Sequence, residues 1–381
     1  MVEPAASSEH QSDAKPFRAD HVGSLLRPAR LIEARRQRES GKISSSQLRR
    51  IEDDCITEVV RQQEEVGLKS VTDGEFRRAW WHLDIFEQIE GVTIREGTIG
   101  PSFRREDGPV KLKTQSISIE AKLKRRRPIQ VENFAFLKSV SHSTPKVTMP
   151  SPSWLYIRSG RDHVSASAYP DLDGFADDLV RVYVEELVDL AAAGCTYVQF
   201  DETNYATLCD KRIRADFRTA GRDPDTLLRA GTALLNDVIA RAPRSMTICV
   251  HACRGNFQSA WVAEGSYEAT ADLLFNGLSA HGYFLEFDDA RSGGFEPLRL
   301  VPKGKRVVLG LVTSKRGRLE SKDSLRRRIE EAARYVPIGQ LCLSPQCGFS
   351  STEHGNQITP AEQMAKLRQI VEVAHDVWGE H

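Results

Sequence analysis

The feature that most constrains this chain is a recurring unit of amphipathic helix, glycine and short apolar run. Apolar residues spaced three and four apart mark the helical stretches, and Gly67 and Gly194 suit the left-handed residue that ends a helix. The runs that follow are continuously apolar, as in strands of a parallel sheet whose two faces are both covered. The pattern therefore predicts alternating helices and strands.

Eight apolar runs fit this rhythm, and helical stretches separate them. Alternating strands and helices favour an α/β fold with a parallel sheet. Eight such units favour a closed (β/α)8 TIM barrel over an open doubly wound sheet, and 381 residues are enough for a barrel with insertions. The runs lie in FRADHVGS, GLKSVTDGEF, KVTMPS, GCTYVQFDET, MTICVHAC, GYFLEFDD, RVVLGLVTS and GQLCLSPQCG.

Two segments depart from the rhythm. Residues 86–145 alternate apolar and polar positions, as in VKLKTQSISIEAKLK, which predicts a β-hairpin insertion after the second strand. Residues 1–16 are polar and rich in small side chains, so we expect a disordered tail. The barrel is thus expected over 17–381. Its last helix should begin at Thr359, Pro360 and Glu362, which match an N-cap, a first-turn proline and a capping box.

Composition excludes several classes of protein. Lys+Arg and Asp+Glu are both 53, so bulk charge favours neither a nucleic acid nor a membrane as partner. No apolar run approaches the length of a membrane span, and the N-terminus lacks the pattern of a secretory signal. Seven thinly spread cysteines argue against a disulfide framework. We therefore expect a cytoplasmic protein whose thiols are free to bind metal.

Functional groups of such a barrel lie at the carboxyl ends of its strands. Nearly every predicted strand ends in polar or metal-binding residues, and this recurrence is more informative than any single motif. The strand-end residues are Gly23, Ser24, Asp73, Glu75, Ser151, Asp201, Glu202, His251, Cys253, Glu286, Asp288 and Cys347.

His251, Cys253 and Cys347 are the candidate metal ligands. Both cysteines follow a strand and precede a polar, glycine-containing loop, and ligands from separate strands fit an open catalytic zinc site better than a structural one. Glu286 or Asp288 would supply an acidic ligand, since alternate residues of a strand point to the same side. The cysteines interpreted as packing residues are Cys55, Cys195, Cys249 and Cys342.

This ligand set favours activation of a sulfur nucleophile. A zinc-bound thiol is deprotonated near neutral pH, and the thiolate is the nucleophilic form. Nearby carboxylates would bind an ammonium group, while backbone amides of the Gly23–Ser24 turn could bind a carboxylate. Trp80, Trp81 and Trp154 form either a flat wall for a pterin or other aromatic donor, or ordinary packing.

At these residues the chain resembles the catalytic C-terminal barrel of cobalamin-independent methionine synthase, in order over most of residues 17–381. DHVGSLLRP is similar to the turn that holds the homocysteine carboxylate, and VTDGEFRR to the segment whose glutamate contacts homocysteine. YVQFDET is similar to the segment whose aspartate takes the homocysteine amino group. VHAC, FLEFDDARS and PQCGF resemble the zinc-ligand segments.

The resemblance implies a role for each matching residue. It gives Glu75 and Asp201 as catalytic and homocysteine-binding residues, and His251, Cys253 and Cys347 as zinc ligands, with Glu286 favoured as the acidic ligand by the strand and Asp288 by Arg291. Gly23, Ser24 and Ser151 complete the expected substrate site. The family's Asp-Glu-Pro is Asp201-Glu202-Thr203 here, and we expect no counterpart of the family's folate-binding N-terminal barrel within these 381 residues.

These residues and the resemblance predict a zinc-dependent thiol S-methyltransferase. It would transfer a methyl group from 5-methyltetrahydrofolate, or another donor, to homocysteine to form methionine. An alkyltransferase of the epoxyalkane–coenzyme M transferase type and a non-catalytic metal-binding protein are the alternatives, while the uroporphyrinogen decarboxylase branch is disfavoured. The expected partners are a small-molecule thiol and an alkyl donor, and the chain could form a homo-oligomer.

Overall fold

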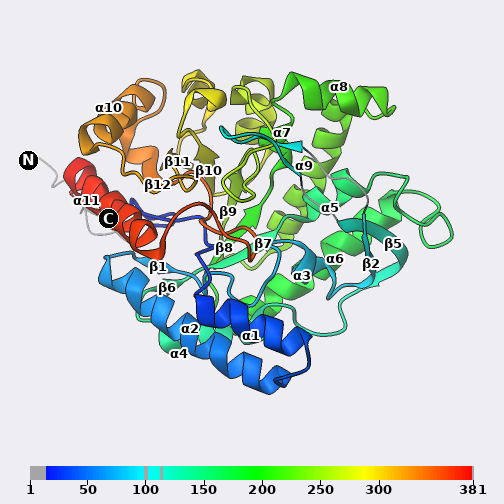
Figure 1. Ribbon diagram of the computed structural model, residues 1–381. Coiled ribbons are helices and arrows are strands. Elements are labelled where there is room, and N and C mark those ends of the chain that lie inside the picture. Colours follow the sequence, from blue (N-terminus) through cyan, green and yellow to red (C-terminus); the bar gives the residue numbers. More distant parts are fainter. Residues whose placement is uncertain (1–13, 98–101, 112–114, 380–381) are drawn as a thin grey trace, which may run out of the picture.

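A six-stranded parallel sheet forms the centre of the molecule. The computed structural model describes residues 14–97, 102–111 and 115–379, so most of the tail predicted at 1–16 lies outside the described residues. The six strands follow chain order across the sheet. They lie in the middle, with helices around them (Figure 1). Their bounds are β7 Val147–Pro150, β8 Tyr197–Asp201, β9 Thr247–Ala252, β10 Gly282–Glu286, β11 Arg306–Val312 and β12 Leu341–Pro345.

Parallel pairing continues beyond both edges of this sheet. β6 (Thr144–Pro145) leads directly into β7 and pairs in parallel with β1 (Ser70–Val71). On the other side Ala19 forms a parallel bridge with Leu343 of β12. All eight apolar runs of the sequence thus take part in parallel pairing, and the α/β class with a parallel sheet is confirmed.

The strands of the central sheet are buried along almost their whole length, as their continuous apolar sequences predicted, and only the first residues of β9 and β11 are partly exposed. Every residue of β8, β10 and β12 is buried, because helices or loops cover both faces of the sheet. α2 packs near β1, α10 near β11 and α11 near β12. The helices are α1 Ala29–Glu39, α2 Ser45–Glu65, α3 Leu83–Phe86, α4 Val131–Val140, α5 Pro152–Ser159, α6 Asp173–Ala192, α7 Asn204–Thr207, α8 Lys211–Thr219, α9 Pro224–Arg241, α10 Lys322–Ala332 and α11 Pro360–Trp378.

The regular alternation of strand and helix fails after β9 and β10. Where we expected helices, both connections fold as short 3₁₀ or π segments, fully within the described part of the chain. Gly293, Gly294 and Pro297 interrupt the second connection, and these residues disfavour a continuous α-helix. These segments are Tyr267–Ala269, Leu273–Gly277, Ala290–Ser292 and Glu296–Leu300, and a further one, Ile338–Gln340, precedes β12.

The segment 86–145 contains antiparallel strands and also a helix. β2 (Glu90–Glu96) pairs antiparallel with β5 (Gln115–Lys124), and β3 (Ser102–Phe103) with β4 (Val110–Lys111). α4 follows them, and its buried Phe134 and Leu137 are spaced three apart, a helical signal that the strand-like alternation nearby obscured. Residues 98–101 and 112–114 lie outside the described part.

Helix ends follow the sequence signals closely. Thr359 and Glu362 form a capping box at the start of α11, with a proline in the first turn. Gly67 and Gly194, at φ +95° and +94°, adopt the left-handed conformation expected after α2 and α6.

Among the described residues, no helix is long and apolar enough to span a membrane.

Candidate metal centre and substrate pocket

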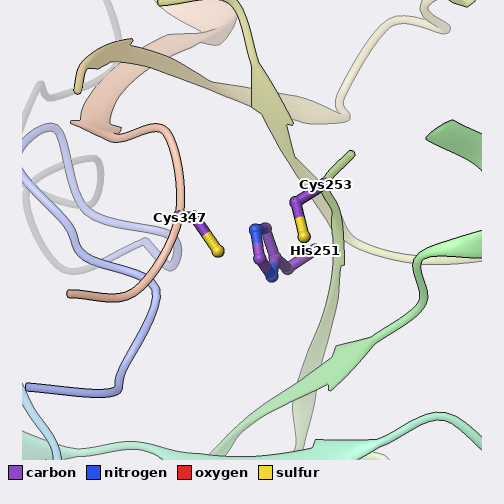
Figure 2. A group of neighbouring side chains, drawn as sticks. All are labelled: His251, Cys253 and Cys347. Carbon is purple, nitrogen blue, oxygen red and sulfur yellow. The ribbon is translucent and has the colours of Figure 1, made fainter. Parts of the chain in front are cut away.

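Two strands far apart in the sheet bring the predicted metal ligands together. His251 belongs to β9 and Cys253 follows it, whereas Cys347 lies just beyond β12. β10 and β11 separate these strands in the sheet. Nevertheless the ligand atoms of the three side chains lie within 4.8 Å of one another. Figure 2 shows the side chains converging from the two sides, and all three are buried.

Asp201 fixes the orientation of the histidine. Asp201 of β8 is the register partner of His251, and its Oδ1 lies 3.0 Å from His251 Nδ1. Gln199 Nε2 donates to the same oxygen at 2.8 Å. His251 Nε2 is buried and has no hydrogen-bond partner among the described residues. A histidine held by a carboxylate through one nitrogen, with the other free beside two thiols, is typical of a metal ligand.

The two thiols of the cluster differ electrostatically from the other cysteines. A hydrogen bond with Cys253 and the nearby His251 hold the pKa of Cys347 well below its usual range, against the effect of burial. The same hydrogen bond, burial and Glu286 raise the pKa of Cys253. By contrast, burial raises the pKa of Cys342 to about 11. The cluster thus offers one imidazole and two thiols, of which Cys347 loses its proton more readily. This is a donor set that fits zinc.

Glu286 interacts electrostatically with Cys253, although its carboxylate lies outside the group of three ligand atoms within 4.8 Å of one another. Glu286 is fully buried at the end of β10; its Oε2 accepts a hydrogen bond from the Arg254 backbone at 2.8 Å, and its Oε1 one from Arg291 Nε at 3.0 Å. Burial opposes ionisation, but Lys315, Arg291 and Arg254 hold its pKa at about 2. Asp288 pairs with Arg291 at 2.7 Å and lines a separate surface pocket. Position therefore favours Glu286.

Glu75 is a second buried carboxylate in the pocket. Thr148 donates to its Oε1 at 2.8 Å, while Oε2 has no hydrogen-bond donor among the described residues and lies 3.6 Å from Arg78. Burial raises its pKa to about 7; Asp201 adds to the effect and Arg78 offsets part of it. Its φ of +61° is uncommon for a residue with a side chain. A free carboxylate oxygen in this position can accept a hydrogen bond from a cationic ligand.

The remaining predicted substrate residues separate into two groups. Ser24 lines the same pocket as the metal cluster, and its backbone oxygen accepts a hydrogen bond from Phe349 at 2.9 Å, which joins the turn to the Cys347 loop. Gly23, at φ +135°, shapes this turn but is not part of the pocket wall. Ser151 is fully buried outside the pocket and bonds Ser153 at 2.5 Å. The structure thus brings Ser24, but not Ser151, to the pocket.

The pocket has a polar part and an aromatic part. Its volume is ≈ 550 Å³. The polar lining residues are Ser24, Glu75, Asp201, His251, Cys253 and Cys347, and the aromatic ones include Trp80, Trp81, Phe103, Trp154, Phe217 and Phe257. A small polar thiol compound and a larger, partly apolar reactant could therefore meet at the cluster.

The three predicted tryptophans line the pocket but do not form one flat wall. Trp81 and Trp154 meet edge to face, with an interplanar angle of 80°. Trp80 instead stacks on Phe257, with ring planes 7° apart. The Trp154 indole nitrogen donates to Thr203 at 3.1 Å. The aromatic part therefore offers faces in more than one direction.

Sequence reasoning missed two polar residues near the cluster. Asn256 lines the pocket and donates to the Gly348 backbone oxygen at 2.7 Å. Lys315, which follows β11, is buried and interacts electrostatically with Glu286 and Cys347. The strand-end rule would have found Lys315, had it been applied to the end of RVVLGLVTS. Asn256 lies in a loop beyond β9, and no periodic signal marked it.

Comparisons with known proteins agree with this geometry. The chain matches the family described as "Cobalamin-independent synthase, Catalytic domain" over residues 17–376. It is 44% identical to the uncharacterized protein YxjG of Bacillus subtilis, covering 98% of each chain. It is 24% identical to the methionine synthase of Pyrococcus abyssi, over 92% of this chain and 91% of that one.

A solved structure from Listeria monocytogenes, provisionally described as a vitamin-B12-independent methionine synthase, is also similar. It is 36% identical, with a TM-score of 0.76, over 96% of this chain and 99% of that chain. The chain therefore belongs to the cobalamin-independent methionine synthase family of methyltransferases, through its catalytic domain.

Proposed function

We propose that the chain is a zinc-dependent thiol S-methyltransferase that converts homocysteine to methionine, with 5-methyltetrahydrofolate or another methyl donor. The observation that carries this proposal is the cluster of His251, Cys253 and Cys347, which opens on one pocket with Glu75 and Asp201. Membership of the methionine synthase family supports the reaction class.

His251, Cys253 and Cys347 would hold the zinc, with Glu286 as the acidic ligand. Zinc there would lower the pKa of a nearby substrate thiol, so that the nucleophilic thiolate predominates at neutral pH. Asp201 keeps the Nδ1 side of His251 occupied, so that Nε2 is left to bind a metal.

Three groups would orient homocysteine. Glu75 Oε2 and the Asp201 carboxylate would bind its ammonium group, because both carboxylates line the pocket beside the cluster. The Gly23–Ser24 turn would hold its carboxylate. With both groups of the α-carbon held, the thiol would reach toward Cys253 and Cys347, and the methyl donor would occupy the aromatic part of the pocket.

The finer architecture is part of this proposal. Side-chain hydrogen bonds join the segment around Asp20 to β1: Ser70 donates to Asp20 at 2.9 Å and Thr72 to the Gly23 backbone at 2.6 Å. Together with the parallel pairing on both sides, this contact supports a closed (β/α)8 barrel. We propose that 17–381 form one zinc-binding barrel unit, with 86–145 as its insertion.

An alkyltransferase that accepts coenzyme M is the second candidate. Arg158 and Arg212 line the pocket, and a guanidinium is a suitable partner for the sulfonate of that thiol. Calorimetric titration of the zinc-loaded protein with homocysteine and with coenzyme M, scored for proton release, separates the two. We expect homocysteine to bind with release of its thiol proton and coenzyme M to bind weakly. The reverse result would favour the epoxide-type enzyme, and no binding of either would favour a non-catalytic metal protein.

Zinc binding itself is tested by substitution of the ligands. Cys347→Ser and Cys253→Ser should each lose most of the bound zinc, because serine is a poor ligand at neutral pH. Glu286→Gln compared with Asp288→Asn identifies the acidic ligand. Metal content by atomic absorption is the measurement, and stoichiometric zinc in the Cys347→Ser protein would contradict the assignment.

A further inference from the structure

Lys315 is a buried cation without an assigned partner. Its side chain is 5% exposed. Its Nζ is buried and has no hydrogen-bond partner among the described residues. Removing a lysine ammonium from water is costly unless other charges or hydrogen bonds compensate for the loss of hydration. The surroundings of Lys315 should therefore contain the negative charge that it needs.

Lys315 lines the second pocket together with Asp288 and Arg291, and the strand before it lies between the strands that lead to two of the proposed metal ligands. Lys315 follows β11, which lies between β10 and β12. Glu286, at the end of β10, is in register with Gly310, and Pro345, two residues before Cys347, is in register with Val312. The end of β11 thus reaches the cluster between Glu286 and Cys347. The electrostatic influence of Lys315 on both groups agrees with this placement.

The two arginines near Glu286 are already engaged. Arg291 donates to Glu286, Asp288 and Asp289. The Arg254 guanidinium donates to backbone oxygens of Gly265, Ser292 and Glu286 and lies over the Tyr267 ring. Lys315 differs from both because its ammonium has no such hydrogen-bond partner in the described part of the chain.

The charge of the loaded centre explains why a cation is needed. Two thiolates and a carboxylate carry more negative charge than one divalent cation neutralises, and a substrate thiolate adds a further negative charge in a buried site. We propose that Lys315 balances this charge. It thereby stabilises the zinc-loaded site with a bound substrate thiolate relative to the zinc-loaded site without one. This inference rests on the proposed function and adds a residue that sets its selectivity for an anionic sulfur.

The inference predicts that the affinity for a thiol and the affinity for zinc respond differently when the charge of Lys315 is removed. In Lys315→Met, the affinity for homocysteine should fall about tenfold or more, because charges interact strongly in a buried site and a loss of about 1.4 kcal/mol corresponds to tenfold. Zinc affinity should stay the same or rise, because the substitution removes a positive charge that repels the divalent zinc ion. Lys315→Arg should bind homocysteine within about threefold of wild type. Lys315→Gln is a second neutral variant, in case the methionine variant folds poorly.

Arg316→Met is the matched control. It removes the same charge from the next residue, but the Arg316 side chain is 58% exposed and pairs with Glu106. Solvent screens such a charge, so both affinities should remain those of wild type. Thiol affinity is measured by calorimetry on the zinc-loaded proteins with homocysteine and 2-mercaptoethanol, and zinc affinity by competition with a chromophoric chelator.

The outcomes separate the inference from the proposed function. Three results would each overturn the charge-balancing role. Lys315→Met could bind both thiols with wild-type affinity, or its thiol and zinc affinities could fall in parallel. In the third, Lys315→Met and Lys315→Arg would lose thiol affinity equally. If wild type binds 2-mercaptoethanol but not homocysteine, the methionine proposal fails, and the simple thiol still tests Lys315. If wild-type zinc protein binds neither thiol, both fail.

Discussion

Asp201 would link substrate recognition to the proposed metal centre, because the residue that the resemblance assigns to the homocysteine amino group also contacts His251. If Asp201 acted on the substrate alone, Asp201→Asn would be expected to weaken homocysteine binding by roughly 1.5–3 kcal/mol and to leave zinc in place. The hydrogen bond to His251 Nδ1 changes that expectation. A carboxylate behind a metal-bound histidine increases its basicity and fixes its ring.

We therefore predict that Asp201→Asn also lowers zinc affinity, by about tenfold or more. Competition with a chromophoric chelator measures this change. Glu202→Gln is the matched control: Glu202 is the next residue and is also buried, but its carboxylate accepts hydrogen bonds from Ser153 and Asn204 instead of contacting His251. Equal zinc affinity in Asp201→Asn and wild type would show that the aspartate does not support the metal ligand.

Glu75 makes stability depend on pH in a defined direction. Its folded-state pKa, about 7, lies above the ordinary value of 4.5, so the folded protein holds the proton more tightly than the unfolded chain. This contribution to stability is fully present below about pH 4.5 and is lost as pH rises through about 7. Glu75→Gln removes this titration while preserving the size of the side chain.

Above pH 7, the free energy of unfolding of Glu75→Gln should thus exceed that of wild type by an amount on the order of 2–3 kcal/mol. Near pH 4.5 the two proteins should differ little. Urea unfolding at both pH values, with chelator present, measures the difference. A constant difference between the two proteins at all pH values would show that Glu75 does not titrate in this range.

At the scale of elements, the sequence predicted those features that have local physical causes. Continuous apolar runs identified the buried strands, and Thr359 with Glu362 identified the start of α11. The connections after β9 and β10 were mispredicted, since their fold depends on packing against the strand ends rather than on periodicity. Lys315 was missed because a lone lysine after a strand has no chemical meaning until Glu286 and Cys347 lie on either side of it.

The capping box of α11 gives a quantitative test at this scale. Thr359→Ala removes the acceptor for the Glu362 backbone N–H, which lies 3.3 Å from Thr359 Oγ1, and should lower the free energy of unfolding by about 1 kcal/mol. Thr57→Ala, on the exposed face of α2, is the control and should change stability little. Urea unfolding measures both, and a Thr359→Ala protein as stable as wild type would contradict the assigned role of the cap.

For the whole molecule, the decisive fact is that β9 and β12 supply ligands to one cluster although nearly a hundred residues of chain separate Cys253 from Cys347. The sequence could propose these ligands, since strand ends of a barrel share one face. It could not show that their atoms converge, because convergence depends on the curvature of the whole sheet. A metal bound there would bind the folded chain in preference to the unfolded one.

Zinc should accordingly stabilise the entire fold. A ligand present at a thousand times its dissociation constant adds about 4 kcal/mol to the free energy of unfolding when it binds only the folded state. Thermal unfolding with zinc, compared with chelator, should show a clear rise in Tm for wild type and almost none for Cys347→Ser. Cys342→Ser, on β12 itself but outside the cluster, should have a lower baseline Tm and keep the zinc-dependent rise. If Cys347→Ser retained that rise in full, zinc would have to be bound elsewhere, and the link between β9 and β12 through the metal would be wrong.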